Sequence, residues 1–392
     1  MLFNLSTERY SLMQNNIKAS SCPNALGKIR KFISEHTVLV VAVVLAIVTS
    51  CIVTPDARYI EYIEYKTITC LFCTLAVICA LKNIKFFTVV ARKIVAFTGN
   101  ARMAILALVY ITFIGSMLIA NDMALITFLP LGYFVLSSTG KQKYMAFTFI
   151  MQNIAANLGG MLTPFGNPQN LYLYSKFNIP TGEFMGIMLL PFAVAIALIT
   201  ICVLFVKREP LVIEDNLGIK LEPKRTTTYI LLFVFSIVIV FNVIPYWYGL
   251  IIIPAVLFFM DKKALKDVDY GLLFTFVCFF IFAGNMARLD VVNRLLSSLL
   301  EKNTLVVSAL SCQFISNVPS AILLSQFTSN YADLLVGVNI GGAGTLIASL
   351  ASLITFGEYS RYNKNNTRKY ILLFSAFNFG FLAILLVVCS IF

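Results

Sequence analysis

The sequence predicts an all-α polytopic membrane protein with about 11 to 13 spans that are arranged as inverted repeats. Of its 392 residues, 59% are hydrophobic and only 12% are charged, and the mean hydropathy is +0.87. A soluble domain carries about 25% charged residues. A single soluble core could not bury so much apolar surface, so lipid must surround most of the chain. This composition excludes a soluble enzyme, a nucleic-acid-binding domain and a disordered scaffold.

The net charge of +12 follows from basic loops between the apolar runs, and no nucleic-acid partner is expected. Lys and Arg are enriched in the cytoplasmic loops of membrane proteins. The loops 82–102, 207–226 and 361–369 are basic and are expected inside, whereas 55–66 contains three acids and is expected outside. The tail 1–36 is therefore predicted to be cytoplasmic. We expect a multi-pass protein of the cell membrane (inner or plasma membrane).

The spans follow from apolar runs, since a membrane-crossing helix needs roughly 20 apolar residues. Some runs are short or are broken by Gly, Pro and Asn, so their number is given as a range. Two amphipathic segments, 86–98 and 288–302, are expected to lie at the membrane surface. The candidate spans lie near 37–54, 67–84, 103–120, 122–139, 144–160, 183–206, 228–243, 249–260, 269–287, 304–329, 331–356 and 370–391.

The longest polar stretch after the start divides the chain into two halves of similar size. The predicted organisation is a cytoplasmic tail (1–36), a first transmembrane half with repeat 1 (37–206), a cytoplasmic linker (207–226) and a second transmembrane half with repeat 2 (227–392).

Neither cysteine nor histidine predicts a metal centre or a catalytic site. Most of the nine cysteines lie in apolar runs, and Cys70-x-x-Cys73 has no second Cys or His pair to complete about four ligands. His36 is the single histidine. A membrane-embedded enzyme would need several acids, histidines or nucleophiles at one depth, so we expect no enzyme.

The two halves share a pair of motifs. The pattern N-x-G-G-x-x-T occurs at Asn157–Thr163 and again at Asn339–Thr345. Upstream of each, an apolar run ends in an asparagine, at Asn121 and at Asn317. The loop charges make these two runs cross the membrane in opposite directions. That arrangement indicates an inverted repeat, the architecture of many secondary transporters.

An acid lies beside the first of these asparagines. Polar residues inside apolar spans are expensive and are functional by default. Asp122 lies between two apolar runs, where a carboxylate needs a cation, a proton or hydrogen bonds from helix ends. A binding or coupling role is favoured, and the alternative is that Asp122 only caps the following helix.

Helix breakers also interrupt the apolar spans. The stretch Thr163–Asn170 reads TPFGNPQN, in which two prolines remove backbone donors and Gly166 permits unusual dihedral angles. Non-helical backbone at membrane depth is tolerated where it lines a cavity. The alternative interpretation of Thr163–Asn170 is an ordinary surface loop. Ser316–Ser320 breaks a helix in the second half, where Asn339 and Thr345 are better binding candidates than the glycines, which also serve close helix packing.

These motifs resemble the ion transporter superfamily, which includes citrate and divalent-anion/sodium symporters, arsenite efflux permeases and certain sodium/proton antiporters. The similarity covers roughly residues 37–391. It implies an inverted repeat in which each half has a re-entrant hairpin and an unwound helix. The first tip corresponds to Ala120-Asn121-Asp122, which is closer to the arsenite permeases, and the second to Ser316-Asn317-Val318. The family's dicarboxylate members have Ser-Asn-Thr at both tips.

The resemblance also implies which residues bind the substrate or ion. The unwound helix places Thr163, Gly166 and Asn167 at the site, and the corresponding offsets in the second half are Thr345 and Ser349. The complete set of candidate substrate- or ion-binding residues is Asn121, Asp122, Asn157, Thr163, Gly166, Asn167, Ser316, Asn317, Asn339, Thr345 and Ser349.

The favoured function is ion-coupled secondary transport of a small anion by alternating access, with a carboxylate such as citrate or a dicarboxylate preferred. No cofactor is expected beyond coupling Na⁺ or H⁺, and the sequence has no Walker A motif for ATP. The alternative is proton-coupled efflux of arsenite or sodium, and a channel is favoured less. The expected partners are a small-molecule or inorganic-ion substrate and the lipid bilayer, and the resemblance leaves a homodimer open.

Overall fold

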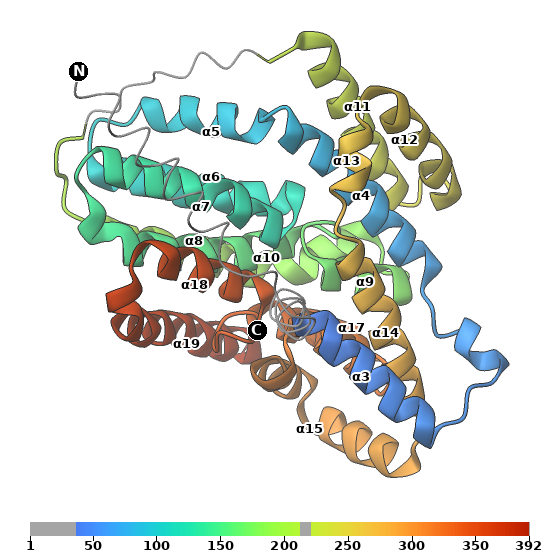
Figure 1. The fold of residues 1–392 in the computed structure, drawn as a ribbon. Helices are drawn as coiled ribbons and strands as arrows, with labels where there is room; N and C mark the ends of the chain where they lie inside the picture. Colours follow the sequence, from blue (N-terminus) through green and yellow to red (C-terminus); the bar gives the residue numbers. More distant parts are fainter. Residues whose placement is uncertain (1–36, 212–220, 392) are drawn as a thin grey trace, which may run out of the picture.

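The computed structural model describes residues 37–211 and 221–391, and every named element in these ranges is a helix (Figure 1). This confirms the predicted all-α class. The predicted tail 1–36, with His36, and part of the predicted linker, 212–220, lie outside the described residues. The division of the chain at 207–226 therefore stays a prediction.

The bounds of the helices follow the predicted apolar runs closely. Those of the first half are α3 (Thr37–Ile52), α4 (Tyr65–Asn83), α5 (Phe86–Ala96), α6 (Ala101–Ile119), α7 (Asn121–Ser138), α8 (Met145–Gly159), α9 (Pro168–Lys176) and α10 (Thr181–Leu204). Those of the second half are α11 (Pro223–Val240), α12 (Tyr246–Met260), α13 (Lys262–Lys266), α14 (Tyr270–Ala287), α15 (Asp290–Ile315), α16 (Asn317–Leu324), α17 (Tyr331–Ile340), α18 (Leu350–Tyr362) and α19 (Thr367–Ile391). The 3-10 turns are η1 (Ala57–Ile60), η2 (Gln142–Tyr144), η3 (Gly160–Leu162) and η4 (Lys364–Asn366).

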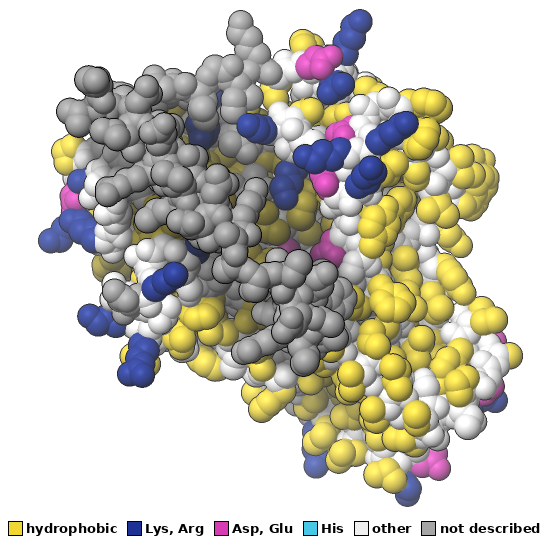
Figure 2. Space-filling view, viewed as in Figure 1, with side chains coloured by type: hydrophobic (Ala, Val, Ile, Leu, Met, Phe, Trp, Pro, Cys, Tyr) yellow, Lys and Arg dark blue, Asp and Glu magenta, His cyan; other side chains and the backbone are white. Residues whose placement is uncertain are grey.

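Six helical stretches of the described chain are long and apolar enough to cross a membrane. Hydrophobic side chains cover much of the visible described surface in Figure 2, while Lys and Arg gather toward the top, over α11 and α13. The chain is therefore a multi-pass membrane protein. The six stretches are Ala57–Asn83, Ala101–Ile119, Thr181–Leu204, Pro223–Val240, Lys262–Ala287 and Thr367–Ile391, and the shorter apolar helices are Thr37–Ile52, Tyr246–Met260 and Tyr331–Ile340.

Two predicted spans are each divided in the structure. The span near 304–329 bends back at Ser316, where α15 gives way to α16, and the span near 331–356 unwinds between α17 and α18. The helix α15 also changes direction at Asn303, whose backbone is not helical and whose Oδ1 accepts a hydrogen bond from the N–H of Val306 at 2.8 Å. This side chain caps the inner segment and separates it from the amphipathic segment predicted at 288–302.

The helices form two packed groups, and each group draws helices from both halves of the chain. In the flanking group, α14 packs along α3, and α4 packs against α11 and α12. In the tip-bearing group, α6, α7 and α8 pack together, as do α15, α16 and α17, with α9, α10, α18 and α19 completing it (Figure 1). The groups meet where α14 contacts α16 and where α4 contacts α9.

A cluster of charged and polar side chains, called the clasp below, links two loops of the tip-bearing group outside the apolar helices. It consists of Glu209, Lys141, Lys143 and Tyr144. Glu209 follows α10 and accepts hydrogen bonds from Lys143, Lys141 and Tyr144, which lie between α7 and α8. These bonds lower the pKa of Glu209 to about 2. The backbone oxygen of Glu209 also accepts from the N–H of Ala101 at 2.8 Å, which ties the same loop to the start of α6.

Candidate functional site

The first hairpin turns at one residue, Ala120, between α6 and α7. Ala120 has φ 65° and ψ 153°. A non-glycine residue adopts this region at an expense of about 1–3 kcal/mol, and such residues cluster at functional sites. Asn121 opens α7, and its Oδ1 accepts from the N–H of Asp122 at 2.9 Å while its Nδ2 donates to Oδ1 of Asn157 at 3.2 Å.

The second hairpin repeats this geometry between α15 and α16. Ser316 has φ 73° and ψ 159°. Asn317 opens α16, and its Oδ1 accepts from the N–H of Val318 at 2.9 Å. Its own N–H donates to the oxygen of Ala348 at 2.9 Å. The two tips therefore share both the rare backbone conformation and the side-chain bond that follows it.

The unwound segment between α8 and α9 is held by side chains. Nδ2 of Asn170 donates to the backbone oxygens of Gly160 at 3.1 Å and Met161 at 3.2 Å. The hydroxyl of Thr163 donates to the oxygen of Met117 at 2.8 Å, which fastens the segment to the first hairpin. These bonds satisfy carbonyls that an uninterrupted helix would have satisfied itself.

The unwound segment between α17 and α18 is held in a related way. Nε2 of Gln313 donates to the backbone oxygens of Gly341 at 2.9 Å and Ala343 at 3.1 Å. The hydroxyl of Thr345 donates to the oxygen of Gln313 at 3.1 Å. Gln313 lies three residues before the tip of its hairpin, as the acceptor of Thr163 does in the first half. This correspondence supports the interpretation of the two motifs as repeats.

The glycines of the two motifs are needed for close packing. A Cβ added to Gly160 would lie 2.4 Å from Oδ1 of Asn167 and 2.8 Å from the oxygen of Gly166. A Cβ added to Gly342, the corresponding position, would lie 3.2 Å from Nδ2 of Asn317. Side chains longer than glycine's would push the unwound segments away from the asparagines.

Two hydrogen bonds cross between the halves at corresponding positions. The hydroxyl of Ser349 donates to Oδ1 of Asn157 at 2.8 Å. Nδ2 of Asn167 donates to Oδ1 of Asn339 at 3.4 Å. In each bond, the asparagine that begins one N-x-G-G-x-x-T motif contacts the residue just before the helix that follows the other motif. These helices are α18, after Ser349, and α9, after Asn167. The unwound segments of the two halves are thereby joined to each other.

Asn339 is the centre of the polar cluster. Its Nδ2 donates to Oδ1 of Asn170 at 2.6 Å and to the oxygen of Leu335 at 2.8 Å. Its Oδ1 accepts from Nε2 of Gln169 at 3.3 Å in addition to Asn167. All four amide side chains are at most 1% exposed. Such a buried network holds the site rigid. Removing any one amide would leave its buried partners unpaired.

Both tips face one small cavity of about 40 Å³, between the tip-bearing group and α3 and α14 of the flanking group. A volume of this size holds about one or two waters or a small ion. The helices α7, α9, α16 and α18 each begin at its wall, and the flanking group contributes mainly apolar side chains. Its polar lining residues are Asn121, Asp122, Gln169, Thr275, Ser316, Asn317 and Ser349.

Several buried polar atoms of this cluster have no hydrogen-bond partner. They are the acceptor oxygens Oδ1 of Asp122, Oδ1 of Asn167 and Oε1 of Gln169, and the donor Nδ2 of Asn157. An unpaired buried polar atom costs about 1–3 kcal/mol and needs an explanation. Two of the four atoms, Oδ1 of Asp122 and Oε1 of Gln169, belong to residues that line the small cavity.

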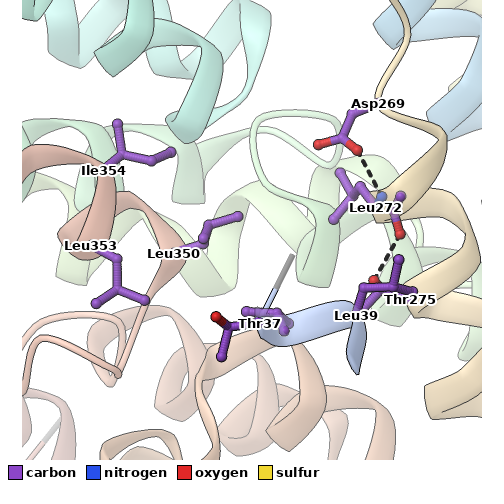
Figure 3. A pocket seen from close by; sticks show the side chains of 10 residues that line it. Thr37, Leu39, Asp269, Leu272, Thr275, Leu350, Leu353 and Ile354 are labelled. Carbon is purple, nitrogen blue, oxygen red and sulfur yellow. Dashed lines mark hydrogen bonds between the residues drawn. The ribbon is translucent and has the colours of Figure 1, made fainter. Parts of the chain in front are cut away.

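A larger cavity of about 310 Å³ adjoins the small one, and the two share lining residues from α3, α14 and α18. Figure 3 shows Leu350 and Leu353 on one side of it and Leu272 and Thr275 on the other. Asp269 is the acid at its edge, and its Oδ1 accepts from the N–H of Leu272 at 2.9 Å. The two cavities therefore lie side by side between α3, α14 and α18.

The structure places the predicted residues in three positions. Those that line the small cavity are Asn121, Asp122, Ser316, Asn317 and Ser349. Those in the hydrogen-bonded cluster beside it are Asn157, Asn167 and Asn339. Those that hold or shape the unwound segments are Thr163, Gly166 and Thr345. Their roles in binding stay predictions.

Sequence reasoning did not single out Gln169, Asn170 or Gln313. The first two lie inside the stretch Thr163–Asn170, whose density of amides was the available signal. Nothing in the sequence distinguishes Gln313 from any other glutamine in a helix. Within the described residues, no group of three or more His, Cys, Asp or Glu side chains could hold a metal ion.

Comparison with known proteins finds similarity to transporters and membrane proteins. Residues 29–333 match a family model described as citrate transporter (CitMHS). An uncharacterized transporter of Methanocaldococcus jannaschii is 34% identical over 307 residues, which cover 78% of this chain and 83% of that protein. The inner membrane protein YbiR of Escherichia coli is 27% identical over 277 residues, which cover 69% of this chain and 73% of that protein.

Proposed function

The chain belongs to the citrate transporter family and is a membrane transporter, and from this premise we propose that it is an ion-coupled secondary transporter of a small anion. A carboxylate such as citrate or a dicarboxylate is the favoured substrate. One end of the solute binds in the small cavity between the two hairpin tips, and the rest extends into the adjoining cavity of about 310 Å³. The solute reaches the two sides of the membrane in alternation. The energy comes from a gradient of Na⁺ or H⁺.

One observation carries the proposal of an anion. Four helices, α7, α9, α16 and α18, begin at the wall of the same small cavity. A helix N-terminus carries about half a positive charge and free N–H groups, so it attracts negative charge. None of the described residues that line the cavity is Lys or Arg. Convergent helix ends, rather than basic side chains, would therefore bind a carboxylate here.

Asp122 supplies the basis for coupling. It lies at the second position of α7, beside Asn121, and its Oδ1 is buried without a partner. An anionic substrate and an ionised Asp122 would repel each other in so small a space. A proton or Na⁺ on Asp122 removes that repulsion. Binding of the coupling ion therefore favours binding of the anion, which is the requirement for symport.

The interface between the two groups of helices suits alternating access. On the flanking side, the cavity is lined by apolar side chains such as Val38, Phe276 and Phe279. Such a wall can slide past the tips, because few polar contacts would be broken. In the tip-bearing group, the network around Asn339 keeps both tips together. Movement of one group against the other would carry the site between the two sides.

The test is charge movement in proteoliposomes on a solid-supported membrane. Citrate, succinate, sulfate, arsenite and Na⁺ alone are added in turn, with and without a pH gradient. We expect a current on carboxylate addition that needs Na⁺ or a pH gradient. Wild-type protein that gives no current with citrate, succinate or sulfate under either gradient contradicts the anion proposal.

The second candidate function is proton-coupled efflux of arsenite or sodium, and the observation that favours it is again Asp122. An acid at the tip offers a site for a cation or a proton without any anion. Under this alternative, the currents follow arsenite or Na⁺ only and need a pH gradient. Where protons are the coupling ion, Asp122→Asn should remove the pH dependence of transport, and an unchanged pH dependence would exclude Asp122 as the coupling acid.

A further inference from the structure

The direction of every hydrogen bond around Asn339 can be assigned from the backbone. Nδ2 of Asn170 faces the oxygens of Gly160 at 3.1 Å and Met161 at 3.2 Å. Backbone oxygens only accept, so the NH₂ group of Asn170 must point toward them. Its Oδ1 then points toward Asn339 and must accept.

The same reasoning extends to Gln169. Nδ2 of Asn339 donates to Oδ1 of Asn170 at 2.6 Å and to the backbone oxygen of Leu335 at 2.8 Å. Oδ1 of Asn339 is therefore turned toward Gln169 and Asn167, and both must donate to it. The remaining atom of Gln169, Oε1, is left as a fixed acceptor. Rotating this amide by 180° would set two oxygens against each other.

This fixed acceptor belongs to a residue that lines the small cavity. Gln169 is 1% exposed, and its Oε1 is buried with no partner in the structure. We propose that Gln169 contacts the transported solute and accepts a hydrogen bond from a hydroxyl group or a protonated oxygen of that solute. The inference rests on the proposed transport function and names a feature of its substrate.

The chemistry of the neighbouring groups defines the solute further. A carboxylate has only acceptors and would be repelled by Oε1 of Gln169, whereas the helix N-termini at the same cavity attract it. A hydroxy acid meets both requirements, with its carboxylate at the helix ends and its hydroxyl at Gln169. Arsenite, as a neutral oxyacid with hydroxyl donors, meets the requirement of Gln169 alone.

The test uses pairs of solutes that differ by one hydroxyl group. Citrate is compared with tricarballylate, and malate with succinate, by calorimetric titration of the purified wild-type protein. We expect the hydroxylated member of each pair to bind about tenfold more tightly, as one hydrogen bond to a buried acceptor implies. In Gln169→Met, the ratio should fall to about one, mainly because the hydroxylated member binds less tightly.

The matched control is Gln326→Met, which makes the same change outside the small cavity and should keep the wild-type ratio. Both affinities in a ratio are measured on the same protein, so a loss of folded protein cannot change the ratio. If Gln169→Met does not fold, the ratio measured on the wild type still tests the hydroxyl preference. Equal binding of both members by the wild type, or an unchanged ratio in Gln169→Met, overturns the inference alone. The inference is also overturned if Na⁺ binds to the wild type without any solute and no longer binds to Gln169→Met.

Arsenite extends the test to the second candidate function. We expect arsenite, if it is the solute, to bind to the wild type and to Gln326→Met but not to Gln169→Met. If the wild-type protein binds none of citrate, tricarballylate, malate, succinate and arsenite, the proposed function is overturned together with this inference. Binding and transport without any hydroxyl preference leave the proposed function intact.

Discussion

Replacing Asn339 by alanine should both destabilise the protein and stop transport. The side chain takes part in three contacts with other amides, those to Asn167, Gln169 and Asn170. Alanine offers neither a donor nor an acceptor. Buried partners in both unwound segments would lose their bonds, and the tips would no longer share one support.

The magnitude follows from the number of bonds. Hydrogen bonds between helices in a membrane contribute about 0.6 kcal/mol on average and about 1.7 kcal/mol at most. Three such bonds give a loss of about 2 kcal/mol, with an upper limit near 5 kcal/mol. The bond from Asn167 should contribute least to this loss. Its Nδ2 also lies 3.4 Å from the backbone oxygen of Asn157, so it keeps an acceptor when Asn339 is replaced.

The assay is unfolding of the purified protein in mixed micelles by titration with SDS, together with solute uptake into proteoliposomes. Asn293→Ala is the matched control, because Asn293 is exposed on the amphipathic segment of α15. A surface change of this kind should stay within about 0.5 kcal/mol. If Asn339→Ala unfolds like Asn293→Ala and transports at the wild-type rate, the account of the network is wrong.

Three further predictions concern other parts of the molecule. Asn121→Ala and Asn317→Ala should each abolish uptake in proteoliposomes while leaving the unfolding midpoint nearly unchanged, and wild-type flux from both would contradict the site assignment. Gly160→Ala should lower both the unfolding midpoint and the uptake rate, whereas Gly186→Ala, whose Cβ would meet no atom within 4 Å, should lower neither. The pKa of Glu209 is lowered to about 2 from 4.5, so its contribution to stability should be complete above about pH 5 and disappear as the pH falls toward 2. Melting curves across this range should show no such acid-dependent loss in Glu209→Gln, and equal acid sensitivity of the two proteins would contradict the clasp.

The helices and their breaks could be predicted because their causes are local. Long apolar runs form helices in lipid, and proline and glycine interrupt them. Asn121 and Asn317 could be selected because each ends an apolar run at a repeated motif. The turn itself occupies one residue at each tip, Ala120 and Ser316, and neither residue type predicts the positive φ that it adopts.

The hydrogen-bonded cluster could not be predicted, because it depends on which segments meet. Gln169 and Asn339 are 170 positions apart in the sequence, and their contact follows from the packing of α9 against α17. The unpaired oxygen of Gln169 follows in turn from bonds that start at Asn170. Sequence spacing contains no information on such a chain of donors and acceptors.

The central claim, that this transporter alternates between two sides around a site at the tips, is tested most directly by counterflow. Proteoliposomes are loaded with a high concentration of unlabelled citrate, or of the solute that gives the largest current, and a trace of labelled solute is added outside. The account predicts a transient accumulation of label above its outside concentration in the wild type and none in Asn317→Ala. A pore would let the label equilibrate without any transient accumulation, and that result in the wild type would contradict the account.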